Sequence, residues 1–295
     1  MRVINDIVRF GLIDNAAGPA QPDVPDGAET NHETQTGGTE KPQNFRWRQV
    51  DSSGEILIVG YRGYELFVRI PQRIEHSTVV GISKNAFANR VFKRVALPCS
   101  VKAIGSYAFA SNRMLYEVAF RKGLETIGAC AFSRCRSIKK LSLPDGLKEI
   151  GESAFEGCAS LSEIIIPGSV REIGAKAFRY CTSLSSAALP DGIETVRPFS
   201  FAGCTGLKEI ILPRTLKRIE TGACCGCEEL SSVTIPEGAE RIGHEAFFGC
   251  INLKEISLPS SLKEVAPDAF KGCPGIAAPW RIAAQAGSTA ASRKL

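Results

Sequence analysis

The sequence has no long uninterrupted apolar run, and its 295 residues include only three histidines. A helix that crosses a membrane needs about 18–20 consecutive apolar residues, so the missing run excludes membrane insertion. The first thirteen residues, MRVINDIVRFGLI, carry Asp6 and Arg9 inside the stretch where a secretion signal needs an apolar centre. We therefore expect a soluble, cytoplasmic protein that is not exported by the general secretory route.

The residues that active sites require are also scarce. His32, His76 and His244 lie far apart in the sequence and form no pair with a nucleophile. No glycine-rich phosphate loop follows a predicted strand and opens a helix. The net charge of +5 is mild and does not require a nucleic-acid or membrane partner. These absences predict a protein that is not an enzyme, with no cofactor, metal site, small-molecule substrate or nucleic-acid partner.

What the sequence does contain is a repeat built on an aromatic frame. The frame positions are Phe87, Phe109, Phe132, Phe155, Phe178, Phe201, Phe247 and Phe270, with Cys224 in the place between Phe201 and Phe247. The first step is 22 residues and every later step is 23 residues. A fixed period between 20 and 50 residues indicates a solenoid, in which each repeat forms one coil.

Each coil has the same predicted elements. In the copy that starts at Phe155, the apolar positions are Leu161, Ile164, Ile166, Val170 and Ile173. The spacing of two between Ile164 and Ile166 is the period of a strand, and Pro167 ends that strand because it cannot donate a ladder hydrogen bond. A second short extended piece contains Ile173. The AFxxC segment is expected to turn the chain inward as a single 3₁₀ or helical turn.

The pattern AFxxCxxLxxIxLPxxLxxIG, repeated over residues 87–276, resembles the leucine-rich repeats of BspA-like surface proteins. Together with the period, this resemblance predicts a β-rich leucine-rich-repeat solenoid, a right-handed curved stack of about eight to nine coils. It also implies a cell-surface location and a role as an adhesin or antigen, in contrast to the cytoplasmic location that the missing signal predicts.

Five regions are expected. Residues 1–13 carry a short amphipathic helix, which is either a frayed end or flap on its own solenoid or a docking peptide for a partner. Residues 14–44 read as a disordered linker because they contain one large apolar residue, Val24. Residues 45–86 form an irregular N-terminal capping unit, residues 87–276 form the repeat array, and residues 277–295 form a C-terminal cap and tail.

Seven of the eleven cysteines belong to the repeat, since each lies three residues after a frame position. They are Cys135, Cys158, Cys181, Cys204, Cys227, Cys250 and Cys273. We interpret them as a structural ladder of small buried residues, because metal ligands must converge on one point rather than spread along a line.

The remaining cysteines break this order. Cys224 replaces a frame Phe, at an expected cost of about 2–4 kcal/mol relative to a well-packed ring. Cys99, Cys130 and Cys225 fall at positions predicted to face solvent, which favours a reducing compartment. The sequence leaves open whether Cys224, Cys225 and Cys227 have a redox role.

Function is expected on the exposed face of the main strands, where solenoids commonly bind partners. Its early coils offer a basic patch with one aromatic residue, and its later coils are serine-rich with two exposed isoleucines. The candidate partner-binding residues are Lys93, Arg94, Tyr116, Lys139, Lys140, Glu163, Ile165 and Ile211. An ordinary solvated charged surface is the competing interpretation.

These features predict a non-catalytic module that binds a protein partner through its strand face. Two alternatives stay open. One is the cell-surface adhesin or antigen that the resemblance implies, and the other is an intracellular scaffold that is recruited through its N-terminal helix.

Overall fold

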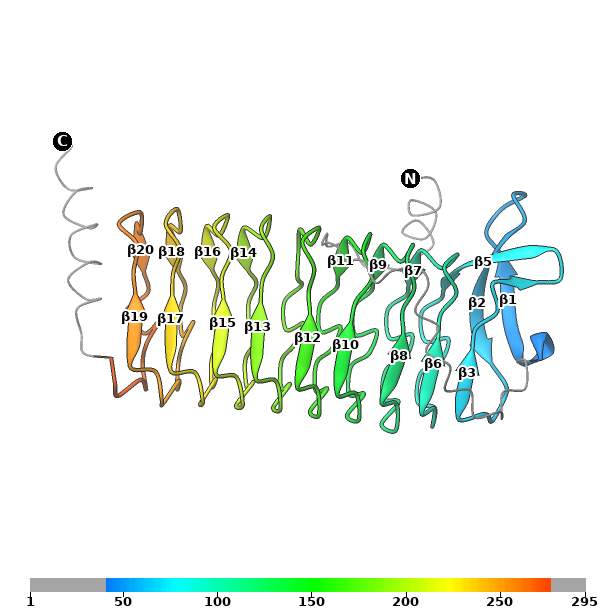
Figure 1. Ribbon diagram of the computed structural model, residues 1–295, viewed down its shortest axis with the longest axis horizontal. Coiled ribbons are helices and arrows are strands. Elements are labelled where there is room, and N and C mark those ends of the chain that lie inside the picture. Colours follow the sequence, from blue (N-terminus) through cyan, green and yellow to red (C-terminus); the bar gives the residue numbers. More distant parts are fainter. Residues whose placement is uncertain (1–40, 277–295) are drawn as a thin grey trace, which may run out of the picture.

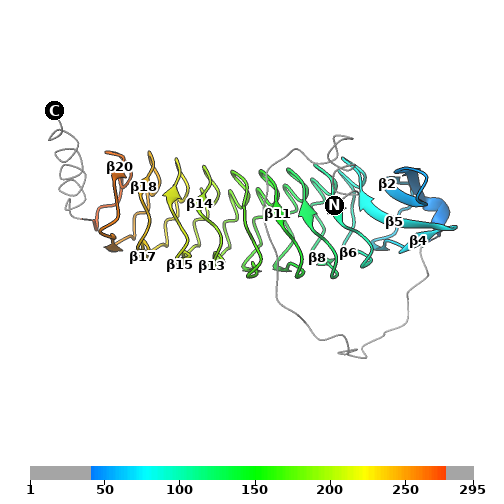
Figure 2. The same ribbon diagram turned by 90° about the horizontal axis from the view of Figure 1, so that it is seen from above.

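A computed structural model describes residues 41–276, which form an elongated stack of coils (Figure 1). The expected helix at 1–13, the linker up to residue 40 and the C-terminal cap and tail at 277–295 lie outside the described residues. The view from above shows the same single file of coils (Figure 2). The predicted β-rich solenoid is confirmed, with about nine turns of about 23 residues.

The main strands line one face of the stack. They are β3 (Phe67–Arg69), β6 (Arg94–Ala96), β8 (Glu117–Ala119), β10 (Lys140–Ser142), β12 (Glu163–Ile165), β13 (Ser186–Ala188), β15 (Glu209–Ile211), β17 (Ser232–Thr234) and β19 (Glu255–Ser257). They are parallel and hydrogen-bonded in the groups β3–β6–β8, β10–β12, β13–β15 and β17–β19. Their register places each residue opposite its counterpart one period later, as Leu141 is opposite Ile164.

A second row of shorter strands runs along another face. After β5 (Ser77–Ile82) it contains β7 (Ala103–Ile104), β9 (Thr126–Ile127), β11 (Glu149–Ile150), β14 (Thr195–Val196), β16 (Arg218–Ile219), β18 (Arg241–Ile242) and β20 (Glu264–Val265). Ile173 continues this row as a single parallel bridge to Ile150.

Alternation along each strand separates the core from the surface. In β10, Leu141 is buried while Lys140 and Ser142 are exposed, as the two-residue period of a strand requires. The same buried middle residue recurs in β12, β13, β15 and β17. The main strands therefore contribute their middle residues to the core and their first and third residues to the outer face.

The turn at the AFxxC segment differs from the prediction of a single 3₁₀ or helical turn, which is wrong. In the coil of Phe132, successive β-turns form instead: Ser133 N donates to Cys130 O at 3.0 Å and Cys135 N to Phe132 O at 3.1 Å. Cys130 and Arg134 have φ values of 55° and 61°. A left-handed residue costs about 1–2 kcal/mol and interrupts a right-handed helix, so the chain cannot continue as one.

The frame rings form a stack through the core. From Phe87 to Phe201, each ring is stacked on the next with centroids 5.0–5.6 Å apart, and Phe247 stacks on Phe270 at 5.3 Å. The buried Cys224 occupies the frame position between Phe201 and Phe247. The aromatic stack is therefore divided into two blocks.

The cysteine ladder donates hydrogen bonds in addition to the packing role that its spacing predicts. In each case the thiol donates to the backbone carbonyl of the frame residue in the preceding coil, for example Cys135 Sγ to Phe109 O at 3.1 Å and Cys158 Sγ to Phe132 O at 3.3 Å. The Phe109 coil has Asn112 at the corresponding position, and Asn112 Nδ2 donates to Phe87 O at 2.8 Å. From the Phe132 coil on, the ladder thiol is a second donor to its carbonyl, because the same oxygen already accepts from a backbone N–H three residues later; each such bond contributes about 0.5–1.5 kcal/mol.

Burial keeps the ladder thiols of the inner coils protonated and able to donate. It raises the pKa of Cys135 from 9.0 to about 12 and raises the pKa values of Cys158 and Cys181 well above the ordinary value. A buried thiolate would lose its hydration without gaining a donor here. The neutral thiol is therefore the form that the folded coil requires.

The N-terminal unit closes the first coil. The 3₁₀ turn η1 (Pro42–Asn44) leads into β1 (Phe45–Gln49), which pairs antiparallel with β2 (Glu55–Tyr61), while β4 (Arg73–Ile74) pairs antiparallel with β5. Regular structure thus begins slightly before the expected linker boundary at Asn44. Phe45 and Tyr61 pack against Phe87, with ring centroids 6.4 and 5.8 Å away. These rings continue the aromatic core to the end of the stack.

Candidate interaction surface

The outer face of the main strands is organised in rows, because equivalent residues of neighbouring coils lie opposite one another. The first strand residues Phe67, Arg94 and Glu117 form one row, which continues in Lys140 and Glu163. The residues immediately before these strands form a second row that includes Lys93, Tyr116 and Lys139. The predicted basic patch therefore spans two adjacent rows of the same face.

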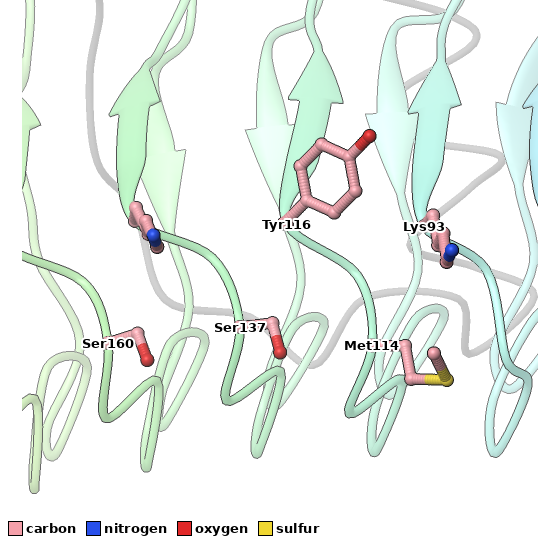
Figure 3. A pocket seen from close by; sticks show the side chains of 6 residues that line it. Lys93, Met114, Tyr116, Ser137 and Ser160 are labelled. Atoms are coloured by element: carbon pink, nitrogen blue, oxygen red, sulfur yellow. The ribbon is translucent and has the colours of Figure 1, made fainter.

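Three of the predicted residues meet in one surface depression of about 410 Å³. Lys93, Tyr116 and Lys139 line it together with Met114, Ser137 and Ser160. Figure 3 shows Met114, Ser137 and Ser160 following one another, one per coil, with Lys93 and Tyr116 in the adjacent row next to the strands. The depression is therefore a shallow trough that crosses several coils.

Two other predicted cations lie outside the trough and are paired. Arg94 Nη2 lies 2.6 Å from Glu117 Oε1, and Lys140 forms an ion pair with Glu163. The hydrogen bond that Arg94 donates to Glu117 raises the pKa of Arg94. None of the ion pairs found among residues 41–276 involves Lys93 or Lys139. Within the predicted basic patch, the cations without a carboxylate partner are thus the two lysines of the trough.

Sequence reasoning missed three trough residues, Met114, Ser137 and Ser160. They lie two residues before Tyr116, Lys139 and Ser162, in the loop that enters each main strand. The constant period aligns these loop residues from coil to coil, as it aligns the strand residues and those immediately before them. Met114 is the important omission, because it adds an exposed apolar side chain beside Tyr116.

The predicted isoleucines form a separate feature nearer the C-terminus. Ile165 on β12 and Ile211 on β15 are 46% and 53% exposed, and Ala188 on β13 lies between them and opposite Ile211. They do not line the trough. The eight predicted residues thus divide into the trough, the ion pairs beside it and a distant apolar strip.

The irregular cysteines differ in their exposure to solvent. Cys224 and Cys227 are buried, Cys225 and Cys130 are half-buried and Cys99 is exposed. Burial raises the pKa of Cys225 and of Cys130, so neither thiol is activated. Within residues 41–276, no group of His, Cys, Asp and Glu has an arrangement that could hold a metal ion. His244 pairs with Asp268 at 3.0 Å on the surface.

The part of the chain that the structure describes contains no helix with the length and apolar character needed to span a bilayer.

Comparison with known proteins gives one family and a set of related folds. The model of the BspA type leucine rich repeat region matches residues 80–196 and 172–278, with six copies. The leucine rich repeat protein of T. pallidum is 26% identical, with a TM-score of 0.44, and the match covers 85% of this chain and 95% of that one. No curated protein matches the chain.

Two further solved structures are more distant. A leucine rich cell surface protein from Faecalibacterium prausnitzii A2-165 is 20% identical over 82% of this chain and 94% of that chain, with a TM-score of 0.38. The pneumococcal vaccine antigen PcpA is 18% identical over 75% and 85% of the two chains, with a TM-score of 0.40.

Proposed function

The chain belongs to the BspA-type leucine-rich repeat family, and we propose that it is a non-catalytic module that binds a protein partner at the trough of its strand face. Proteins of this repeat family are generally non-enzymatic. The observation that carries the proposal is the combination in the trough of Tyr116, Met114 and two lysines without carboxylate partners. Tyrosine is enriched among the residues that dominate binding energy, and unpaired charge selects the partner.

The trough chemistry indicates what the partner segment carries. Lys93 and Lys139 flank Tyr116 in one row, one coil to either side. A bound segment would place an apolar or aromatic side chain against Tyr116 and Met114 and carboxylates near the two ammonium groups. Because the coils share one continuous core, the face is preorganised, and little ordering entropy is lost when the partner binds.

Charge reversal tests this proposal. The full chain is immobilised and used to capture proteins from lysate as wild type, as Lys93→Glu/Lys139→Glu, and as the matched control Lys208→Glu/Lys254→Glu on distant coils of the same row. We expect the trough variant to lose specific partners by at least about tenfold, the control to keep them, and the wild-type binding to weaken as salt rises. Equal capture by all three proteins would reject the trough as the binding site.

A role as a cell-surface adhesin or antigen is the second candidate, and family membership supports it. Limited proteolysis of intact cells that express the native protein tests this role, because only a surface-exposed chain is cleaved while the cells stay closed. Full protection of the chain in intact cells, with cleavage after lysis, would remove this candidate and leave the binding module.

A further inference from the structure

Exposed apolar side chains gather at the N-terminal end of the strand face. Of the eleven large apolar side chains exposed among the described residues, six lie on the first three main strands or within three residues before them: Tyr64, Leu66, Phe67, Val91, Met114 and Tyr116. We call these six the N-terminal apolar patch. Tyr64 is 92% exposed, Val91 60% and Phe67 54%. A concentration of this kind on one face of a soluble protein marks an interaction site.

Strand register makes the patch continuous. Phe67, Arg94 and Glu117 lie opposite one another on β3, β6 and β8. Tyr64, Val91 and Met114 each precede one of these residues by three positions, and Leu66 and Tyr116 precede them by one. Adjacent coils are about 4.8 Å apart, so the patch crosses only about 10 Å along the stack. Figure 1 shows β3, β6 and β8 side by side next to the N-terminal unit.

The chain outside the structure begins beside this patch. Forty residues precede Lys41, and the apolar residues among them are concentrated in residues 1–13, including Val3, Ile4, Ile7, Val8 and Phe10. The 27 residues from 14 to 40 can span up to about 90 Å when extended and about 30 Å on average as a flexible chain. Either length is ample for the first thirteen residues to reach three coils at the same end of the molecule.

Charge also favours this encounter. Residues 1–40 contain seven acidic residues and two arginines, a net charge of −5, whereas the whole chain carries +5 and the remaining residues therefore carry +10. Lys93 and Lys139, the two trough lysines, form none of the ion pairs found among residues 41–276 and border the patch. A second copy that met patch against patch would bring these lysines toward their own equivalents, which disfavours self-association through this surface.

We propose that residues 1–13 dock in cis on the N-terminal apolar patch. Their apolar residues cover Val91, Met114 and Tyr116, and the acidic stretch that follows passes the lysines of the trough. Tethering raises the local concentration of the segment to about the millimolar range, so a weak contact is sufficient to occupy the patch. If the trough binds a partner as proposed above, the docked segment competes with that partner, but the docking itself does not depend on the partner.

Tryptic cleavage after Arg9 in the full-length chain tests the proposal. The free reference is a synthetic peptide of residues 1–20, which contains the same cleavage site. We expect the intact chain to be cleaved after Arg9 at least about tenfold more slowly than the peptide. The double variant Val91→Glu/Met114→Glu should remove most of this protection, because it places two charges in the exposed patch. The control Ile211→Glu, equally exposed on β15, should leave the protection unchanged.

Each outcome of this experiment is decisive. A cleavage rate in the intact chain equal to that of the peptide would overturn the proposal. Protection that persists in the double variant would place the segment elsewhere, and protection that grows with protein concentration would indicate a second copy rather than docking in cis. Thermal unfolding of each variant checks that the solenoid remains folded, and no partner enters the assay, so its result is independent of the proposed function.

Discussion

Replacing Cys224 by phenylalanine tests the most specific feature of the core, the gap in the aromatic stack. Rings stack without interruption from Phe87 to Phe201 and again from Phe247 to Phe270. A ring at position 224 would join the two blocks, with one neighbour on each side. We expect Cys224→Phe to stabilise the protein because it adds buried apolar surface and two ring contacts.

The change in unfolding free energy is the difference between a gain from the buried ring and a cost of repacking its neighbours. Losing a buried Phe for a small residue typically costs about 3–5 kcal/mol, and Cys retains part of the side chain, so restoring the ring is worth about 2–4 kcal/mol. Displacing neighbours that have closed around the thiol costs about 1–3 kcal/mol. The Cys250 thiol keeps its acceptor, since it donates to the backbone oxygen of residue 224 at 3.2 Å. A net gain of about 1 kcal/mol remains, equivalent to a rise in Tm of about 2–4 °C for a protein of this size.

Thermal and urea unfolding of three proteins measures this effect. Wild type is compared with Cys224→Phe and with the reciprocal variant Phe155→Cys, which creates the same gap in a regular coil and should lower stability by about 2–4 kcal/mol. Because repeat arrays can unfold in parts, the urea m-value is followed along with the midpoint. A lower Tm for Cys224→Phe at unchanged m-value would refute the reasoning, since the site would then have repacked fully around the smaller side chain.

Three further predictions concern the ladder and the charged rows. Burial raises the pKa of Cys135 to about 12, so above pH 9 the thiol ionises in the unfolded chain but not in the folded one. The free energy of unfolding should therefore fall by about 1.4 kcal/mol per pH unit for each such thiol. The urea midpoint should be lower at pH 10 than at pH 8. Asn112→Ala should cost about 2–4 kcal/mol of unfolding free energy because it leaves the carbonyl of Phe87 without a donor, whereas Asn112→Cys should recover part of that loss. Lys140→Ala should change unfolding free energy by less than about 1 kcal/mol in the same assay, because its ion pair with Glu163 is exposed.

The coil could be predicted from the sequence because one period determines most of it. Apolar residues two apart mark the main strand, and proline ends it, so Ile164, Ile166 and Pro167 already define the strand and its end. Register follows from the constant step of 23 residues. The number of coils could therefore be predicted from the repeat alone.

The turn was hard to predict because only part of its left-handed backbone falls on glycine, as at Gly157 and Gly203. Left-handed backbone is usually marked by glycine or asparagine, but here it also occurs at Cys130, Arg134 and Lys176. These residues adopt positive φ because the hydrogen bonds between coils require it. Tertiary contacts therefore override local preference at these positions.

The trough was only partly predictable. Lys93, Tyr116 and Lys139 were found because they precede the strands at a fixed position, but Arg94 and Lys140 were counted as available cations although each pairs with a glutamate. Both ion pairs could be predicted from the sequence, since each joins residues one period of 23 apart. Comparing each outward residue with its equivalent in the next coil would have removed them from the basic patch.

Charge alternates along the row formed by the first residues of the main strands, and this alternation constrains how the gene can gain or lose repeats. Arg94, Glu117, Lys140 and Glu163 occupy successive coils, with each cation paired to the next acid. A recombination that removed one repeat would preserve the core but bring Arg94 beside Lys140, and like charges directly opposite each other are destabilising. Removal of two repeats would instead bring Arg94 beside Glu163. In this half of the array, repeats are therefore gained or lost with less penalty in pairs than singly.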